Sequence, residues 1–323
     1  MCSKAAPATI YRKCGHKSDG VEKTYKYFPG ECLSVGPSQG LVYAINQEIV
    51  IKVPFQYPVL EDTSTHHLLD LSLRSFVSLE KELAVYQTIK AHPHLNITRR
   101  LETDEANCLF LERLTPLEAA WRTSNEPDRR RWALELLDAV RWLENQGWAN
   151  GDLAVRNLGV DSTNRLKVFD FGSAVDRCHP DYENDLRRDH FDLATCLHFI
   201  LSGIDPFTGA NSYAEVKKVR ATLESGHGVV GPGAEVLTGI IQDGWTGRGS
   251  TRFSQDFERA FDILGPLARS TPTDQSESHY QRLESHCRDW LHNSPRNPHW
   301  KDVEGYLLDC KAVGLEADMD MWR

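Results

Sequence analysis

Two aspartates and an asparagine lie at short spacing between residues 149 and 172. Four residues separate Asp152 from Asn157, and Asp170 opens an Asp-Phe-Gly turn directly after a short apolar run. Carboxylate and amide oxygens are ligands that suit Mg²⁺, and a further carboxylate can accept the proton of an attacking hydroxyl. Phosphoryl transfer requires this combination, because the protein mainly positions the nucleophile and neutralises phosphate charge. We predict that Asn157 and Asp170 bind the metal and that Asp152 orients the acceptor.

The segments before this stretch predict a small sheet and one helix. Residues 40–55 predict two strands around a tight turn at 46–48, because β-branched and aromatic residues dominate both sides. Residues 56–71, which hold two adjacent histidines, predict a loop. Residues 75–92 predict a helix, since apolar side chains recur three or four apart until a proline ends the run. Residues 107–114 predict a buried strand.

The segments after it are mainly helical. A helix is predicted over residues 125–148, with Asn125 as its N-cap. Residues 189–203 predict a deeply buried helix that ends at Gly203, and residues 210–265 predict further helices with glycine-rich breaks.

This order of elements predicts an α+β fold with two lobes, a small antiparallel-sheet N-lobe with one helix and a larger, mainly helical C-lobe. We assign residues 1–28 to a loose N-terminal arm, 29–112 to the N-lobe and 113–265 to the C-lobe. Residues 266–323 are assigned to a linker and a helical tail docked on the body. Three of the eight tryptophans lie in that tail, and we expect its aromatic side chains to dock on the helical lobe.

Composition excludes several classes of protein. The net charge of −9 argues against a general nucleic-acid surface, which needs a basic face. Eight cysteines form no Cys-x-x-Cys pair, so neither a zinc site nor a disulfide framework is predicted. The first residues lack the apolar core of a signal peptide, and no run is long enough to span a membrane. We expect an intracellular protein, cytoplasmic or nuclear, with no membrane partner.

Together these residues resemble the eukaryotic protein-kinase fold over about residues 34–265. The run GDLAVRN at 151–157 resembles the catalytic loop of that family, and the Asp-Phe-Gly at 170–172 is identical to its metal-binding motif. Lys52 and Glu82 stand where the family has its phosphate-binding lysine and the helix glutamate that pairs with it. The chain looks most like the divergent protein-kinase-like proteins common in filamentous fungi.

The resemblance implies an ATP-dependent phosphotransferase that uses Mg²⁺ and transfers the γ-phosphoryl group to a protein or small-molecule hydroxyl. It implies that residues 111–114 form the hinge whose backbone holds adenine, and that Asp189 anchors the catalytic loop. The catalytic residues it implies are Lys52, Glu82, Asp152 and Arg156, with Asn157 and Asp170 as metal ligands. The nucleotide-binding residues it implies are Gly36, Gly40, Val42, Val50, Lys52, Leu111, Glu112, Leu114 and Gly159.

The sequence departs from the family pattern in its phosphate loop and its adenine pocket. Val35 and Pro37 stand where the first two loop glycines belong, although a shift would let Gly36 compensate. A side chain and a proline without an N–H weaken a backbone cradle for phosphate. Gly159 replaces an aliphatic residue of the adenine floor, which predicts a roomier pocket.

Two further departures concern the acceptor. Asn150-Gly151 replaces the usual His-Arg of the catalytic loop, and the short segment from Gly172 to Asp189 has no Ala-Pro-Glu motif. The short segment favours a small or unusual acceptor. The Arg156-Asn157 pair instead resembles the catalytic loops of tyrosine kinases, in which the arginine helps to seat a protein hydroxyl as the acceptor. The alternative is that Arg156 caps loop carbonyls.

Other functions and other roles stay open. One alternative is a pseudokinase or nucleotide-binding scaffold, and another is a kinase-like fold that catalyses a different transfer in a specialised pathway. Asp152 and Asp170 could instead serve as helix or turn caps. Lys52 and Glu82 could instead form an exposed ion pair that contributes little to stability.

Overall fold

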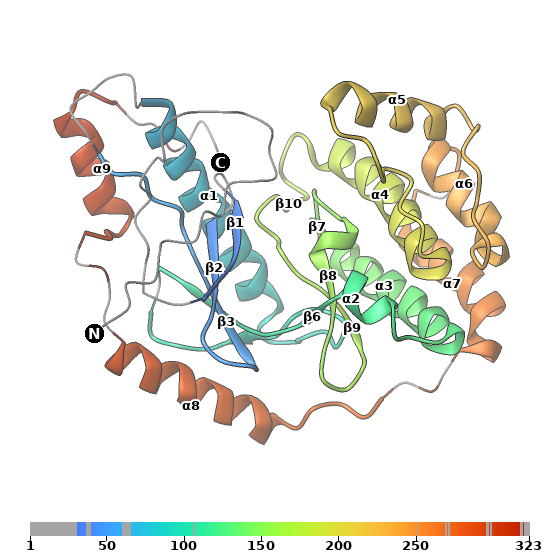
Figure 1. The fold of residues 1–323 in the computed structure, drawn as a ribbon, viewed down its shortest axis with the longest axis horizontal. Coiled ribbons are helices and arrows are strands. Elements are labelled where there is room, and N and C mark those ends of the chain that lie inside the picture. The colour runs from blue at the N-terminus through green and yellow to red at the C-terminus, as the bar shows by residue number, and fades with distance from the viewer. Residues whose placement is uncertain are drawn as a thin grey trace, which may run out of the picture.

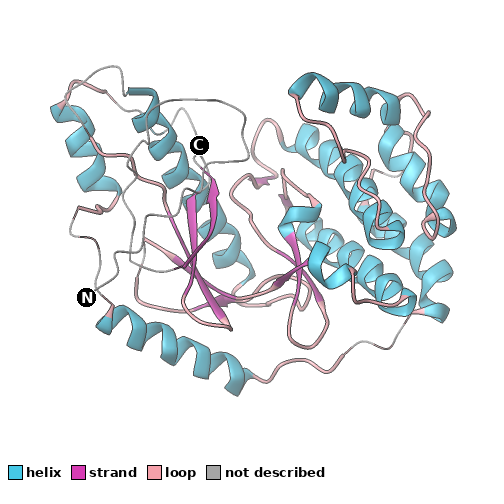
Figure 2. Ribbon diagram, viewed as in Figure 1, coloured by secondary structure: helices cyan, strands magenta, loops and turns pink. Residues whose placement is uncertain are grey.

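The computed structural model describes residues 31–36, 40–59, 66–105, 107–249, 251–268, 270, 272–294, 297, 299–316 and 319. The predicted N-terminal arm, residues 1–28, lies outside them. The described chain is an α+β structure in which a small antiparallel sheet is followed by a mainly helical remainder (Figures 1 and 2). None of the described helices is long and apolar enough to cross a lipid bilayer.

Five antiparallel strands form the first sheet, in the order β1-β2-β3-β5-β4. Their bounds are β1 Glu31–Gly36, β2 Gly40–Ala44, β3 Ile49–Val53, β4 Arg100–Leu101 and β5 Leu109–Glu112. Across the ladders Val42 is opposite Lys52, and Val50 is opposite Leu111. Because directly opposed residues project from the same face, these four side chains share one face of the sheet. The predicted turn at 46–48 is confirmed, and Asn46 caps it by accepting hydrogen bonds from the N–H groups of Glu48 and Ile49.

Helix α1, His66–Ile89, packs against this sheet and begins earlier than predicted. The prediction placed its first residues, including both histidines, in a loop, and this was wrong. Leu68, Leu69 and Leu73 are buried against the sheet, so tertiary contacts support a first segment whose local sequence resembles a loop. With β1–β5, α1 forms what we call the sheet part.

The helical part follows and lies beside the sheet part in Figure 1. Its helices are α2 Leu117–Trp121, α3 Glu126–Asn145, α4 Tyr182–Ser202, α5 Tyr213–Glu224, α6 Thr238–Thr246 and α7 Phe253–Leu264. Its short strands are β6 Thr115–Pro116, β7 Trp148–Ala149, β8 Leu158–Val160, β9 Leu166–Val168 and β10 Val175–Asp176. Strand β8 pairs with β6 and β9, and β10 pairs with β7.

The capping residues of two long helices were predicted correctly. The side chain of Asn125 accepts a hydrogen bond from the N–H of Asp128 at the start of α3. Gly203 ends α4 with a φ of 77°, a left-handed conformation that glycine adopts without strain. Helix α4 starts at Tyr182 rather than Asp189, so its first two turns take up much of the short segment after Gly172.

The C-terminal helices return to the sheet part. Helix α8, Glu277–Asn293, and helix α9, Val303–Ala312, bury apolar side chains in a cluster with Ile51 and Phe110, on the face opposite to Lys52. The ring of Trp290 meets that of Phe110 edge-on at 5.9 Å. For the described residues of the tail, the expectation that its aromatic side chains dock on the helical part was therefore wrong; Trp322 lies outside the described residues. The tail helices thus cover the apolar face of the sheet that lies opposite to Lys52.

A buried ion pair in α3 supports the β8–β9 hairpin. Arg131 Nε lies 3.2 Å from Glu135 Oε1, and Glu135 Oε2 accepts a hydrogen bond from the N–H of Leu166. Burial raises the pKa of Glu135 to about 7, against the lowering effects of that hydrogen bond and of the Arg131 and Arg165 charges. Since the ordinary value is 4.5, the folded protein binds more protons than the unfolded chain between these two pH values.

Stability should therefore fall as pH rises through this window, and Glu135→Gln should remove the effect. Between pH 5 and 7 we expect the free energy of unfolding of the wild type to drop, relative to that of the variant, by about 1.4 kcal/mol per pH unit. Above pH 7 the difference should stay level. Urea unfolding at four pH values measures this, and parallel profiles would show that Glu135 does not titrate there.

Candidate functional site

Three of the predicted site residues are in contact: two carboxylates surround one lysine. Lys52 Nζ lies 2.6 Å from Glu82 Oε2 and 2.7 Å from Asp170 Oδ1. The lysine comes from the central strand β3, the glutamate from α1, and the aspartate from the turn after β9. Lys52 is 5% exposed and Glu82 is fully buried, so the pair is not the exposed ion pair considered above.

Charge and backbone conformation both mark this cluster as unusual. Burial lowers the pKa of Lys52, but the attraction of Glu82 and Asp170 outweighs it, so the pKa is raised and the lysine is charged. Asp170 has a φ of 66°, a left-handed conformation that is uncommon for residues other than glycine. The surrounding structure has to stabilise both the buried lysine and the uncommon backbone conformation of Asp170. Strained backbone conformations and perturbed charged groups are frequent at functional sites.

The predicted catalytic loop is anchored by Asp189. Its two carboxylate oxygens accept hydrogen bonds from the backbone N–H groups of Asn150 at 2.6 Å and Gly151 at 2.9 Å. Gly151 has a φ of 77°, and a Cβ there would lie 2.3 Å from the carbonyl oxygen of Ser173. Glycine is therefore required at this position, because the loop turns against the segment after Gly172.

Asp152 is tied to its neighbours in the loop. One guanidinium nitrogen of Arg156 lies 2.6 Å and 2.8 Å from its two carboxylate oxygens. The side-chain amide of Asn157 donates to the backbone carbonyl of Asp152 at 2.8 Å and to Oδ2 at 3.2 Å. Neither contact is a helix cap, and among the described residues Arg156 donates to Asp152 and to no loop carbonyl. Arg156 is nearly two-thirds exposed, so it can leave the carboxylate at little cost.

The predicted metal ligands lie at the same end of the β8–β9 hairpin. The N–H of Phe169 donates to the carbonyl of Asn157, which brings Asp170 next to the asparagine in the fold. Within the described residues, Asn157 Oδ1 and Asp170 Oδ2 have no hydrogen-bond partner. Two uncommitted hard oxygens fit Mg²⁺ when phosphate and water complete the coordination. No described group of three or more His, Cys, Asp or Glu side chains could hold a metal without such added ligands.

The predicted nucleotide-binding side chains are only partly brought together. Val42, Val50 and Leu111 lie on the face of the sheet that carries Lys52 and pack into the main apolar cluster. The Glu112 side chain projects from the opposite face, where it forms a 2.6 Å ion pair with Lys167. Glu112 therefore offers the Lys52 face only backbone atoms.

The prediction of a roomier pocket at Gly159 was wrong. A Cβ at Gly159 would lie 2.7 Å from the Cβ of Leu114, so the leucine already fills the space that the glycine leaves. Gly36 and Gly40 face each other where β1 and β2 meet. Gly40 has a φ of 122°, and a Cβ there would be 2.6 Å from the carbonyl oxygen of Val53, so the sheet itself requires this glycine.

Sequence reasoning missed two residues that border the site. A Cβ added to Gly172 would lie 2.1 Å from Ser78 Oγ, so the Asp-Phe-Gly turn packs tightly on α1. Ser78 lies four residues before Glu82 and thus on the same helix face, a spacing that could have revealed it. Asp192 lies three residues after Asp189 on α4; burial raises its pKa to about 6, against the opposing charges of Arg220 and Arg188.

The contact between Gly172 and Ser78 yields a paired prediction. Gly172→Ala should destabilise the protein by about 1–3 kcal/mol, because the new methyl group overlaps the serine hydroxyl. Ser78→Ala alone should cost little, since that hydroxyl has no hydrogen-bond partner among the described residues. In the double variant the nearest remaining atoms are 3.4 Å away, so most of the loss should be recovered. Chemical denaturation of the four proteins measures the coupling, and additive losses would contradict it.

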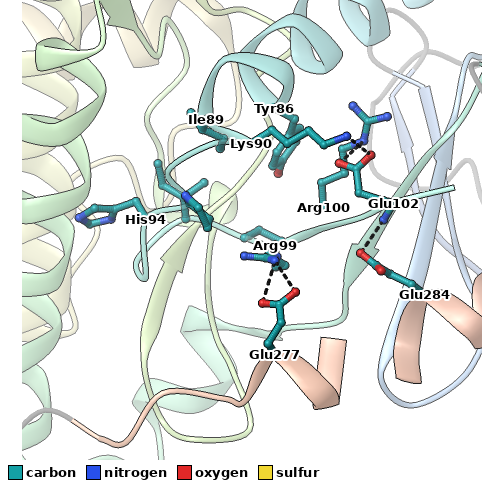
Figure 3. Close-up of a pocket in the computed structure, with 12 residues that line it drawn as sticks. Tyr86, Ile89, Lys90, His94, Arg99, Arg100, Glu102, Glu277 and Glu284 are labelled. Atoms are coloured by element: carbon teal, nitrogen blue, oxygen red, sulfur yellow. Dashed lines mark hydrogen bonds and ion pairs between the residues drawn. The ribbon is translucent and has the colours of Figure 1, made fainter. Parts of the chain in front are cut away.

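A separate cavity of about 240 Å³ is drawn in Figure 3. It is bordered by the end of α1, by the segment around β4 and by α8. Tyr86, Arg99, Glu102, Glu277 and Glu284 are among its lining residues, whereas Lys52, Asp152 and Asp170 are not. The cavity is thus distinct from the candidate site.

A scan against models of known protein families found no match, and a search of curated proteins found no significant relative. The functional conclusion therefore depends on the residues and their geometry.

Proposed function

We propose that this chain is a phosphotransferase with a bilobal, protein-kinase-like fold that transfers the γ-phosphoryl group of ATP to a hydroxyl. The observation that carries the proposal is the cluster of Lys52, Glu82 and Asp170, with contacts of 2.6 Å and 2.7 Å. A strand lysine, a helix glutamate and the aspartate of an Asp-Phe-Gly turn come from three distant segments. The arrangement would place a fixed cation beside phosphate oxygens and an anion beside their metal.

In this proposal each loop residue has one task. Asn157 and Asp170 would hold Mg²⁺, which supplies charge neutralisation at the phosphates when it is bound. Asp152 would accept the proton of the acceptor hydroxyl once Arg156 has moved from its carboxylate. Asp189 fixes the loop backbone, so it acts as a positioning residue.

The acceptor is proposed to be a small molecule or an unusual protein site. Only residues 173–181 separate Gly172 from α4, and β10 within them is paired with β7. This leaves little chain for the extended platform on which protein kinases place a peptide.

A second candidate is a nucleotide-binding scaffold without turnover. The observation that favours it is the ion pair that occupies both oxygens of Asp152. A base engaged in this way is a poor proton acceptor until the pair opens.

Calorimetric titration of the full chain with ATP, with and without Mg²⁺, tests the proposal, followed by an assay of ADP release. Binding that requires Mg²⁺ together with ADP release supports the phosphotransferase. Binding without ADP release, even with a panel of hydroxyl acceptors, favours the scaffold. An absence of binding at millimolar ATP would refute both.

A further inference from the structure

Helix α8 contacts both parts of the molecule. In Figure 1 the chain leaves the helical part after α7 and crosses back, so that α8 lies along the sheet part. The residues just before α8 are held by the β8–β9 turn: Arg165 donates to the Pro272 carbonyl at 2.7 Å and to Asp274 at 2.5 Å. Gln275 donates to Ser162 in the same turn at 3.2 Å.

The helix itself is held by the sheet part. Arg282 makes contacts of 2.6 Å and 3.0 Å with Glu48 in the β2–β3 turn. Figure 3 shows Glu277 directed at the guanidinium of Arg99, and Glu284 at the backbone N–H of Glu102. The segment from residue 272 to 284 thus connects two turns that belong to different parts of the molecule.

Between these anchors α8 passes over the hinge segment, residues 111–114. Tyr280 is buried, and its hydroxyl lies 3.5 Å from Glu112 Oε2 and 3.4 Å from Lys167 Nζ. Lys167 in turn holds Glu112 Oε1 at 2.6 Å, and the same oxygen accepts a hydrogen bond from the N–H of Arg99. One carboxylate of the hinge segment is therefore held from the helical part, from the sheet part and from α8.

The charges make this contact hard to break. Lys167 and Glu112 are each about 5% exposed, so separating them would leave the buried Glu112 carboxylate without its counter-charge, whereas Lys167 would keep Asp161 at 3.7 Å. Burial lowers the pKa of Lys167, but the nearby Glu112 carboxylate and Tyr280 raise it overall, which keeps the lysine charged. Opening the two parts about residues 111–114 would need α8 to release one set of anchors first.

We propose that residues 272–294 form an intramolecular strap that fixes the hinge segment, with Tyr280 and Lys167 as positioning residues that act through Glu112. Its effect on nucleotide binding rests on the proposed function, because that function places adenine against the hinge backbone. The strap would set how far the two parts can open, and so how tightly a nucleotide is held between them.

The chain offers a matched pair of variants for the test. Tyr280→Phe removes the hydroxyl at Glu112 and keeps the ring under Arg99, whose guanidinium carbon is 4.9 Å from the ring centre. Tyr306→Phe removes another buried tail hydroxyl, which donates to the carbonyl of Tyr57 at 2.8 Å rather than to the hinge segment. Tyr280→Phe removes two long contacts of 3.4 Å and 3.5 Å, and Tyr306→Phe removes one short hydrogen bond of 2.8 Å, so a purely structural role predicts at least as large an effect from Tyr306→Phe.

Hydrogen exchange of the amides of residues 109–114 and calorimetric binding of ATP with Mg²⁺ should be measured on the wild type and both variants. We expect Tyr280→Phe to speed hinge exchange and weaken ATP binding, each by about threefold, and Tyr306→Phe to match the wild type. Unchanged hinge exchange in Tyr280→Phe, or equal changes in both variants, would overturn the strap. A wild type that binds no ATP would refute the proposed function, while the exchange result would still decide the strap.

Discussion

The Asp170→Asn variant should lose Mg²⁺-dependent ATP binding and turnover while keeping its fold. Asn has the same shape and tolerates a left-handed backbone, and Lys52 keeps its 2.6 Å contact with Glu82. What disappears is the anionic oxygen that would bind the metal. A bound Mg²⁺ supplies several kcal/mol of charge stabilisation, so we expect turnover to fall by about 1,000-fold.

Calorimetry and ADP release on the two proteins measure this. Asp289→Asn, which removes an exposed carboxylate from α8, controls for the loss of one negative charge. If Asp170→Asn binds Mg²⁺ and ATP as the wild type does, Asp170 is only a turn residue and the metal assignment fails.

The Asp152→Asn variant should separate binding from transfer. The amide cannot accept a proton from the acceptor, so transfer should fall by about 100- to 10,000-fold, the range for general base catalysis. Binding of ATP with Mg²⁺ should be nearly unchanged, because the shorter contact of Asn157 is to the backbone carbonyl of Asp152 at 2.8 Å, which the substitution leaves in place. The ion pair with Arg156 is partly exposed, so stability should change by less than about 1 kcal/mol.

Arg156→Gln, measured beside it, separates the two roles considered for that arginine. A rise in turnover would mean that the ion pair restrains Asp152. A raised KM for the acceptor with unchanged ATP affinity would mean that Arg156 seats the acceptor. Unfolding of Asp152→Asn in mild urea would instead show that Asp152 is structural.

The sequence by itself determined the local elements and the residues able to do chemistry. Strands β2 and β3, the turn between them, the Asn125 cap and the Gly203 stop were predicted because each depends on neighbouring residues. The α+β order of elements followed from the same periodicities. Lys52, Glu82 and Asp170 were chosen by residue type and order, and the structure brings them together.

Only the tertiary structure decided how those pieces meet. The first turns of α1 form because Leu68 and Leu69 find a buried surface, which no local pattern reveals. Leu114 fills the space beside Gly159 because the fold packs together two segments that lie far apart in the sequence. The docking of α8 on the sheet was missed for a related reason. Its anchors lie more than a hundred residues away in sequence, so they exist only after the chain has folded.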